Sequence, residues 1–298
     1  MYRIGIDLGG TNIAAGLVDE NGAIVDRAAV KTNLPTDPDR IVRNMAHLTR
    51  TLMERNGLRN GQIHSVGVGV PCTADLQNGW MRDADHLGFS SAPLKAPLEK
   101  ALGLPVRMAN DADAAALGEF RGGGYEGTSF VLVTLGTGIG GGIILNGQLY
   151  TGINNAAGEL GHMTIHMDGQ PCGCGRKGCF EAYGSATALI RQACAATRDT
   201  VTEAKTVFDR AAAGEQAYIS VLDRYTAYLA EGFANIINIF GPDYLCIGGG
   251  VSAAGDALLE PVRAKTFDRV FAKKAGSNTR IVLARLGNDA GILGAALL

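Results

Sequence analysis

The sequence lacks long hydrophobic runs, a charge excess of either sign and a secretory leader. Its longest apolar segments, such as residues 130–135, have the length of a strand and fall far short of the ~20 residues that span a membrane. Lys and Arg total 27 and Asp and Glu 29, and this formal net charge of −2 gives no electrostatic reason to expect nucleic acid or an anionic membrane as a partner. We therefore expect a soluble, cytoplasmic protein with neither partner.

The length and the glycine content indicate two domains with many tight turns. A chain of 298 residues is too long to fold around one small hydrophobic core, so we expect two domains. The 42 glycines cluster at the ends of apolar runs, where the backbone turns sharply or approaches a ligand closely. Among several predicted helices, the longest covers residues 215–240, and its apolar spacing places five residues on the core side: Ile219, Leu222, Leu229, Phe233 and Ile237.

Three of the six cysteines lie close together. Cys172, Cys174 and Cys179 fall within eight residues, and His162 lies ten residues before the first of them. Thiolates and imidazole suit tetrahedral zinc, and a Cys3His set leaves no position for a reactive water, so we predict a structural zinc site. Buried free cysteines or disulfides are the alternatives, but neighbouring Cys172 and Cys174 pair poorly with each other. The remaining three cysteines stand alone and are expected in the core: Cys72, Cys194 and Cys246.

Glycines and acids surround this cysteine cluster. Gly173, Gly175 and Gly178 allow a short loop to fold back around one ion, because glycine adopts positive φ at little cost. Two carboxylates, Glu159 and Glu181, flank the cluster. A rigid loop that ends in a fixed acid is what a binding site needs.

The N-terminal strand ends in an acid and a glycine turn. Asp7 is followed by Gly9, Gly10 and Thr11, and a second strand begins directly afterwards. The glycines let backbone N–H groups approach an anion, the threonine adds a hydroxyl, and Asp7 can hold a magnesium ion through water. The segment therefore predicts a phosphate-binding turn, although a plain hairpin turn would have the same composition. It is neither the dinucleotide fingerprint nor the Walker loop, because it lies between two strands.

Asn110 and Asp111 are the best catalytic candidates. They follow a predicted strand at 104–109 and precede an alanine-rich helix, and ligands of α/β sheets gather beyond the carboxyl ends of strands. The alternative is that one of these acids only caps the helix. We expect Asp113 to be the cap, which leaves Asp111 for chemistry.

The chain contains an internal repeat. Residues 6–11 and 133–138 share one form, a strand followed by a glycine-threonine turn, and each unit closes with an Asn-Gly turn, at 21–22 and 146–147. A chain built twice on one hairpin plan predicts two facing domains with a phosphate loop from each and the nucleotide between them. A third glycine run at 248–250 follows a buried strand and is either another ligand contact or a tight turn.

Together these motifs resemble the ROK family of repressors and sugar kinases. The resemblance runs from Ile4 to the final helix and rests on six segments: 7–12, 110–111, 135–143, 158–162, 172–181 and 247–250. It implies an α/β fold of the actin-like type, a duplicated ribonuclease-H-like fold, with two domains and an interdomain cleft. The smaller domain would comprise residues 1–112, completed by a C-terminal helix at 288–298, and the larger domain residues 113–287 with the zinc loop.

The resemblance also implies transfer of the γ-phosphoryl group of ATP to a hexose, with glucose the leading substrate. Asp111 is then the catalytic base, and the implied cofactors are ATP, Mg²⁺ with the nucleotide, and structural Zn²⁺. The implied sugar-binding residues are Asn110, Asp111, Glu159, His162 and Glu181. The implied nucleotide-binding residues are Asp7, Gly9, Gly10, Thr11, Asn12, Thr137, Gly138 and Gly249. The zinc ligands are His162, Cys172, Cys174 and Cys179, and a homodimer or homotetramer is expected.

Other substrates and one other class stay open. Cys72-Thr73 and His86 depart from the pattern of many family glucokinases, so another hexose or an N-acetylhexosamine is the alternative: N-acetylmannosamine, N-acetylglucosamine, allose or fructose. A sugar-sensing repressor of this family carries a helix-turn-helix ahead of the kinase-like body, and the first turn here begins at Asp7. We therefore expect an enzyme rather than a regulator or an inactive sugar-binding protein.

Overall fold

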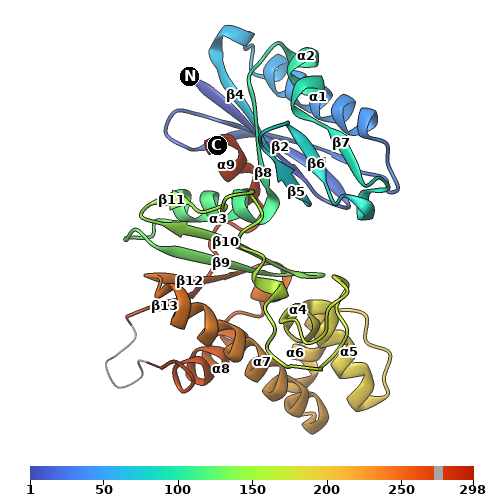
Figure 1. Cartoon of the computed structure of the whole chain (residues 1–298), viewed down its shortest axis with the longest axis vertical. Helices are drawn as coiled ribbons and strands as arrows, with labels where there is room; N and C mark the ends of the chain where they lie inside the picture. Colours follow the sequence, from blue (N-terminus) through green and yellow to red (C-terminus); the bar gives the residue numbers. More distant parts are fainter. Residues whose placement is uncertain (272–277) are drawn as a thin grey trace. The chain divides into compact units, whose positions relative to one another are not determined.

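A computed structural model describes residues 1–271 and 278–298. Its first sheet has five strands in the order β3-β2-β1-β4-β8 (Figure 1). β1, β2 and β3 pair antiparallel, whereas β4 and β8 run parallel to β1. The bounds are β1 Tyr2–Leu8, β2 Asn12–Val18, β3 Ile24–Lys31, β4 Ile63–Val70 and β8 Val106–Asn110.

The second sheet repeats this plan. Its order is β11-β10-β9-β12-β13, in which β10 and β11 pair antiparallel and β9, β12 and β13 pair parallel. The predicted internal repeat is therefore confirmed at the level of topology. The bounds are β9 Phe130–Leu135, β10 Ile139–Leu145, β11 Gln148–Leu149, β12 Tyr244–Gly248 and β13 Arg280–Leu283.

Two further groups of elements belong with the first sheet. The helix α1, Pro38–Arg55, begins after Asp37, whose side chain accepts a hydrogen bond from the backbone N–H of Arg40 at 2.7 Å, as expected for a helix cap. Its apolar face and that of α2, Lys95–Leu102, join one core cluster with the sheet. A small antiparallel sheet follows β4, with strands β5 Thr73–Asp75, β6 Trp80–Arg82 and β7 Ser91–Pro93.

The last helix, α9, Asp289–Leu297, packs backbone to backbone on its neighbours. A Cβ built on Gly67 of β4 would lie 1.7 Å from the carbonyl oxygen of Ala295. Likewise, a Cβ on Gly294 would lie 1.6 Å from the carbonyl oxygen of Ala114 in α3, Asp111–Gly122. Only glycine permits such close approach, so these positions hold α9 against both the sheet and α3.

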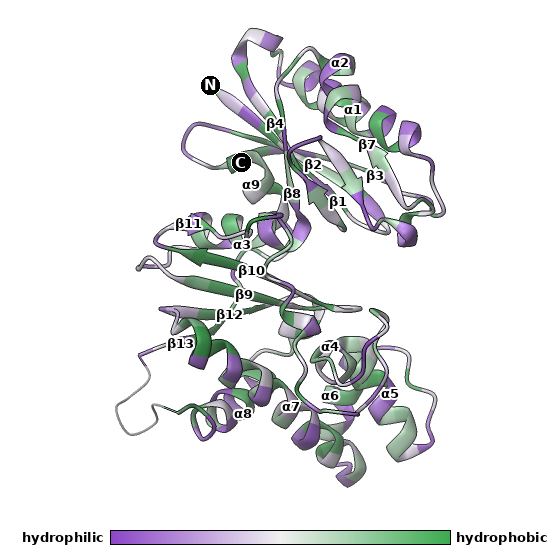
Figure 2. Ribbon diagram, in the orientation of Figure 1, coloured by the Kyte–Doolittle hydropathy of each residue, from purple (hydrophilic) through white to green (hydrophobic). Residues whose placement is uncertain are grey.

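Most remaining helices follow the metal-site segment along the chain. They are α4 Glu181–Gly184, α5 Ala186–Thr197, α6 Ala204–Ala212, α7 Gln216–Phe240 and α8 Asp256–Phe267. Figure 2 shows β9, β10 and β12 mostly in the green of hydrophobic residues, as expected for buried strands. Leu229, Phe233 and Ile237 of α7 are buried as predicted, but Ile219 is 39% exposed, so its assignment to the core was wrong.

The described residues form two compact units. One comprises Met1–Glu126, Gly142–Gly158 and Arg285–Leu298, and the other Gly127–Gly141 and Glu159–Ala284. These bounds differ from the predicted division after residue 112, because α3 packs tightly on α9 and stays with the N-terminal unit. Within the described part of the chain, no helix is both long and apolar enough to cross a membrane.

Candidate active site and metal centre

The first group of candidate residues lies at one edge of the first sheet. β1, β4 and β8 are parallel, so their carboxyl ends meet at the same edge. Asp7 of β1 pairs in register with Gly69 of β4, and Val70 of β4 pairs with Asn110 of β8. The structure thus places Asp7 and Asn110 on either side of β4, each near the end of its strand as the sequence predicted.

Asp7 is an acid in a confined place. A Cβ built on Gly291 of α9 would lie 3.0 Å from its Oδ2 atom, so the helix approaches the carboxylate without a side chain between them. Burial raises the pKa of Asp7, because the charged form loses hydration. A divalent cation near this carboxylate would favour its charged form, and this fits the predicted place for magnesium.

The turn after Asp7 is fixed by hydrogen bonds and open to solvent. The Gly9 N–H donates to the Asn12 carbonyl at 2.9 Å, and the Thr32 hydroxyl donates to the Gly9 carbonyl at 2.7 Å. Gly10, Thr11 and Asn12 are exposed. Neither Gly9 nor Gly10 has positive φ, so these glycines serve by leaving the turn uncovered rather than by an unusual backbone conformation.

The cap of α3 differs from the prediction. Asn110, not Asp113, precedes the helix, and its Oδ1 accepts hydrogen bonds from the N–H groups of Ala112 at 2.9 Å and Asp113 at 3.4 Å. Asp113 is 3% exposed and lies inside the first turn, so its assignment as the cap was wrong. The helix begins one residue after β8 ends, which gives the cap to the last residue of the strand.

Asp111 is the first residue of α3 and is half-buried. Its Oδ1 accepts a hydrogen bond from the Ala112 N–H at 2.8 Å, which fixes the carboxylate at the helix N-terminus. Burial and, second, the charge of Asp111 raise the pKa of the Cys72 thiol to about 12. Cys72 is 7% exposed and its carbonyl accepts from the Asn110 amide at 3.3 Å, which confirms its place in the core and puts it beside both candidate residues.

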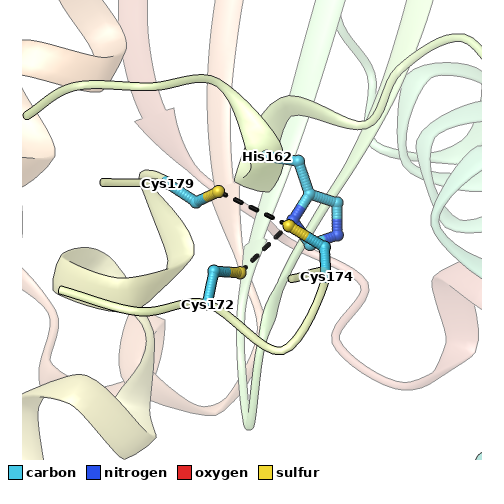
Figure 3. A group of neighbouring side chains, drawn as sticks. All are labelled: His162, Cys172, Cys174 and Cys179. Carbon is cyan, nitrogen blue, oxygen red and sulfur yellow. Dashed lines mark hydrogen bonds between the residues drawn. The ribbon is translucent and has the colours of Figure 1, made fainter. Parts of the chain in front are cut away.

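The predicted zinc ligands come together. One ligand atom from each of His162, Cys172, Cys174 and Cys179 lies within 4.8 Å of every other, and the four side chains point toward one another (Figure 3). The Cys172 Sγ lies 3.6 Å from the His162 Nδ1, and the Cys174 Sγ lies 3.6 Å from the Cys179 Sγ. Tetrahedral zinc bonded to sulfur at about 2.3 Å and to nitrogen at about 2.0 Å needs separations of about 3.8 and 3.5 Å. The donor set therefore fits zinc in its chemistry, and these two separations are close to those of a tetrahedral shell.

The loop that carries these ligands depends on two of its glycines. Gly175 and Gly178 have φ of +85° and +76°, and a Cβ on Gly178 would lie 1.8 Å from the His166 carbonyl oxygen. Gly173 has no such constraint. Burial raises the pKa of the Cys172 thiol to about 12, whereas the Arg176 N–H lowers the pKa of Cys174. A bound cation would favour the thiolate of both.

Phe180, between the last ligand and Glu181, is a contact that the sequence reasoning missed. Its ring is fully buried and packs edge-on against Phe233 of α7, with 6.0 Å between ring centroids. A Cβ on Gly232 of α7 would lie 2.6 Å from this ring. Gly232 therefore makes room for Phe180, and the pair holds the chain between Cys179 and Glu181 against α7. The sequence offered one sign of this contact, the position of the aromatic Phe180 directly after the predicted ligand Cys179.

Glu181 is held by one backbone group and lies beside the metal cluster. Its Oε2 accepts a hydrogen bond from the Ile139 N–H at 2.9 Å, and the Cys172 Sγ lies 3.7 Å from its Oε1. A Cβ on Gly138 would lie 2.3 Å from the Oε2, so the second glycine turn is shaped around this carboxylate. The predicted link between the metal cluster and a fixed acid is therefore present in the structure.

The other candidates belong to the same compact unit as Glu181. Glu159 is exposed and directly precedes a short 3-10 helix, Leu160–His162, that carries the histidine ligand. Thr137 is exposed, and its carbonyl accepts a hydrogen bond from the Thr187 hydroxyl at 2.8 Å. Gly249 has a φ of +79°, and its Cβ would lie 2.5 Å from the Leu135 carbonyl oxygen, so glycine is required there for conformation.

Comparison with known proteins gives the family. Residues 3–298 match the ROK family. A glucokinase from Halalkalibacterium halodurans is 36% identical over 312 residues, which cover 100% of this chain and 94% of the relative. An N-acetylmannosamine kinase from Salmonella newport is 35% identical over 303 residues, which cover 100% of this chain and 98% of the relative.

A solved structure is similar over nearly the whole chain. The ROK family glucokinase from Streptomyces griseus, in complex with glucose and AMPPNP, has a TM-score of 0.84 and 34% identity, covering 99% of this chain and 98% of that one. The chain belongs to the ROK family, and its fold is that of the ROK kinases, the actin-like type predicted from the sequence.

Burial of Asp7 leads to a test by pH. Burial raises the pKa of Asp7 in the folded protein above the value of 3.8 expected in the unfolded chain. The stability that Asp7 contributes is therefore fully present below pH 3.8, where the side chain is neutral. It is lost as the pH rises through the folded-state pKa and the buried carboxylate becomes charged. Asp7→Asn removes the buried charge, so the variant should be more stable than the wild type at pH 8, and the two should converge toward pH 4. Urea unfolding across this range measures the difference.

Asp75→Asn serves as the control of opposite sign. The side chain and N–H of Asn78 lower the pKa of Asp75, so this variant should lose stability at pH 7, and the loss should disappear as the pH falls below 3.8. An Asp7→Asn protein no more stable than the wild type at pH 8 contradicts the burial argument.

Proposed function

We propose that the chain is an ATP-dependent sugar kinase that transfers the γ-phosphoryl group to a hexose hydroxyl, with glucose as the leading substrate. The observation that carries this proposal is the pair Asn110 and Asp111, an amide and a carboxylate held at the N-terminus of α3 beside the strand-end acid Asp7. The likeness to a glucokinase that binds glucose and AMPPNP, an analogue of ATP, supports it.

Asp111 is the base in this proposal. A sugar hydroxyl is a weak nucleophile at neutral pH, so a carboxylate that takes its proton accelerates attack on the γ-phosphorus. The hydrogen bond from the Ala112 N–H occupies one oxygen of Asp111 and orients the other. Phosphoryl transfer depends mainly on position and charge neutralisation. Magnesium held through water near Asp7 would supply that neutralisation, and the exposed turn at Gly9, Gly10, Thr11 and Asn12 would bind phosphate oxygens.

The metal centre supports the sugar site in this proposal. With the Nδ1 of His162 facing Cys172, the Nε2–H is left to donate to a sugar oxygen, and a bound metal would fix this tautomer. Glu181, beside the same cluster, and Glu159, just before the histidine, accept from other hydroxyls. Because the four ligands complete the zinc shell, zinc would supply geometry and not an activated water.

Three more residues are proposed for the nucleotide: Thr137, Gly138 and Gly249. The exposed Thr137 turn repeats the form of the first turn, and the exposed Gly249 begins the turn after β12. Gly138 also gives room to Glu181, so this turn would serve both substrates. A homodimer or homotetramer stays a prediction.

A second substrate class has support of its own. The N-acetylmannosamine kinase is nearly as similar to this chain as the glucokinase is, at 35% and 36% identity. An ADP-coupled assay with glucose, mannose, fructose, allose, N-acetylglucosamine and N-acetylmannosamine distinguishes the substrates. We expect the highest kcat/KM with glucose. No turnover of any of these sugars refutes the kinase proposal.

Asp111→Asn should separate catalysis from binding. The amide keeps the shape and one hydrogen bond but cannot accept the proton, so kcat should fall by about 100-fold or more while the sugar KM stays within about threefold. Steady-state kinetics with glucose measure both. Asp39→Asn, the loss of an exposed first-turn acid in α1, is the control and should leave kcat unchanged. A near wild-type kcat for Asp111→Asn would mean that the base lies elsewhere.

Gly138→Ala should weaken sugar binding through Glu181. The new methyl group would lie 2.3 Å from the Oε2, so the carboxylate must move and lose its hydrogen bond to Ile139. Loss of a charged hydrogen bond to the sugar predicts roughly tenfold weaker glucose affinity, measured by calorimetry without nucleotide. Gly136→Ala, in the same turn but with nothing within 4 Å of its added Cβ, should bind glucose normally. Equal affinity in the two variants contradicts the role given to Glu181.

A further inference from the structure

Glu119 of α3 is a buried carboxylate that neither substrate in the proposed function uses. Its side chain is 0% exposed. The Oε1 accepts hydrogen bonds from the Arg285 N–H at 2.6 Å and from the Tyr125 hydroxyl at 2.8 Å, and the Oε2 accepts from the Leu286 N–H at 3.0 Å. A carboxylate buried this deeply is costly unless its oxygens are bonded, and two of these donors are backbone groups in a fixed geometry.

These hydrogen bonds join three segments within one compact unit. Tyr125 follows the turn after α3, and Arg285 and Leu286 lead into α9. The Arg285 guanidinium lies 4.6 Å from the centre of the Tyr125 ring and donates to the Gly123 carbonyl at 2.5 Å. The chain passes between the two units at four places, and two of these, after Glu126 and before Arg285, adjoin the Glu119 partners Tyr125 and Arg285.

Several close contacts of α3 with its neighbours are made at glycines. Gly118 and Gly294 bring the backbones of α3 and α9 together, and Gly142 of β10 approaches Ala112 and Ala116 in the same manner. The side chain of Leu293 in α9 also packs against α3, because a Cβ on Gly122 would lie 2.5 Å from its Cδ2. The hydrogen bonds of Glu119 are directional and fix the position of α3 along its axis.

We propose that Glu119 is a positioning residue for phosphoryl transfer, which holds α3, and thereby the Asp111 carboxylate at its first residue, in place. The two residues are eight positions apart on one helix, about 12 Å along the axis, and an α-helix transmits a shift at one end to the other. A base displaced by about 1 Å can lose as much as a hundredfold in rate. The proposal rests on the proposed role of Asp111.

A double-mutant cycle tests the proposal. Glu119→Gln leaves an amide that can accept only part of the three hydrogen bonds, so kcat with glucose should fall by roughly tenfold or more. In an Asp111→Asn background no base remains to be misplaced, so adding Glu119→Gln should lower the residual kcat by less than about threefold. An equal fold-loss of kcat in the two backgrounds overturns the proposal, because a general loss of structure lowers kcat whether or not Asp111 is present. An unchanged kcat when Glu119→Gln is made in the wild type also overturns it.

Two further variants keep the test informative. Tyr125→Phe removes one hydrogen bond and keeps both backbone donors, so it should fold, lower kcat about threefold and have no effect in the Asp111→Asn background. Asp243 is the matched control, because its carboxylate also accepts hydrogen bonds from two backbone N–H groups, those of Thr128 and Ser129, at 2.9 Å. These residues lie in the segment that follows Tyr125, outside α3 and in the other compact unit. Asp243→Asn should therefore reduce stability and leave kcat unchanged. A kcat loss in Asp243→Asn equal to that in Glu119→Gln also overturns the proposal.

Failure of the proposed function is distinguishable from failure of this inference. Wild-type kcat in Asp111→Asn refutes Asp111 as the base, and Glu119 then has no base to position. A normal Asp111 effect combined with equal Glu119→Gln losses in both backgrounds refutes only the positioning role.

Discussion

The position of the Glu181 carboxylate depends on one backbone hydrogen bond and on the metal cluster beside it. The Ile139 N–H holds one oxygen to the second sheet, and the Cys172 thiol of the metal cluster lies beside the other. The loop that carries the three cysteine ligands is short, rich in glycine and mostly exposed. It therefore has no buried core of its own to hold its shape. The burial of Phe180 against α7 fixes one end, and a metal bound by the four ligands would fix the rest.

The two sheets share one plan, but their glycine turns differ in what they contact. Both sheets have the same strand order, and each begins with a strand, a glycine turn and a second strand. In the first sheet the turn stays open beside Asp7, whereas in the second it closes around Glu181. The same hairpin thus stays exposed to solvent in one copy and orients a carboxylate in the other.

Local patterns made the elements and the metal ligands predictable from the sequence. The spacing of four ligands and the repeated turns are short-range features, and the structure confirms that the ligands cluster and that the topology repeats. The cap of α3 was missed because its identity depends on where β8 ends, and Ile219 because periodicity does not say which turns of α7 are covered. Glu119 carries no local signal at all, since its partners lie as far as 167 residues away.

The zinc content of the purified chain, measured together with glucose affinity before and after chelation, tests the central claim most directly. A tetrahedral site formed by His162 and three cysteines predicts one zinc per chain, and structural zinc in small peptide sites contributes on the order of 10 kcal/mol to local folding. Removing the metal should therefore weaken glucose binding strongly and leave ATP binding nearly unchanged. A protein that contains no zinc and binds glucose fully, or one that loses both affinities equally on chelation, contradicts this account.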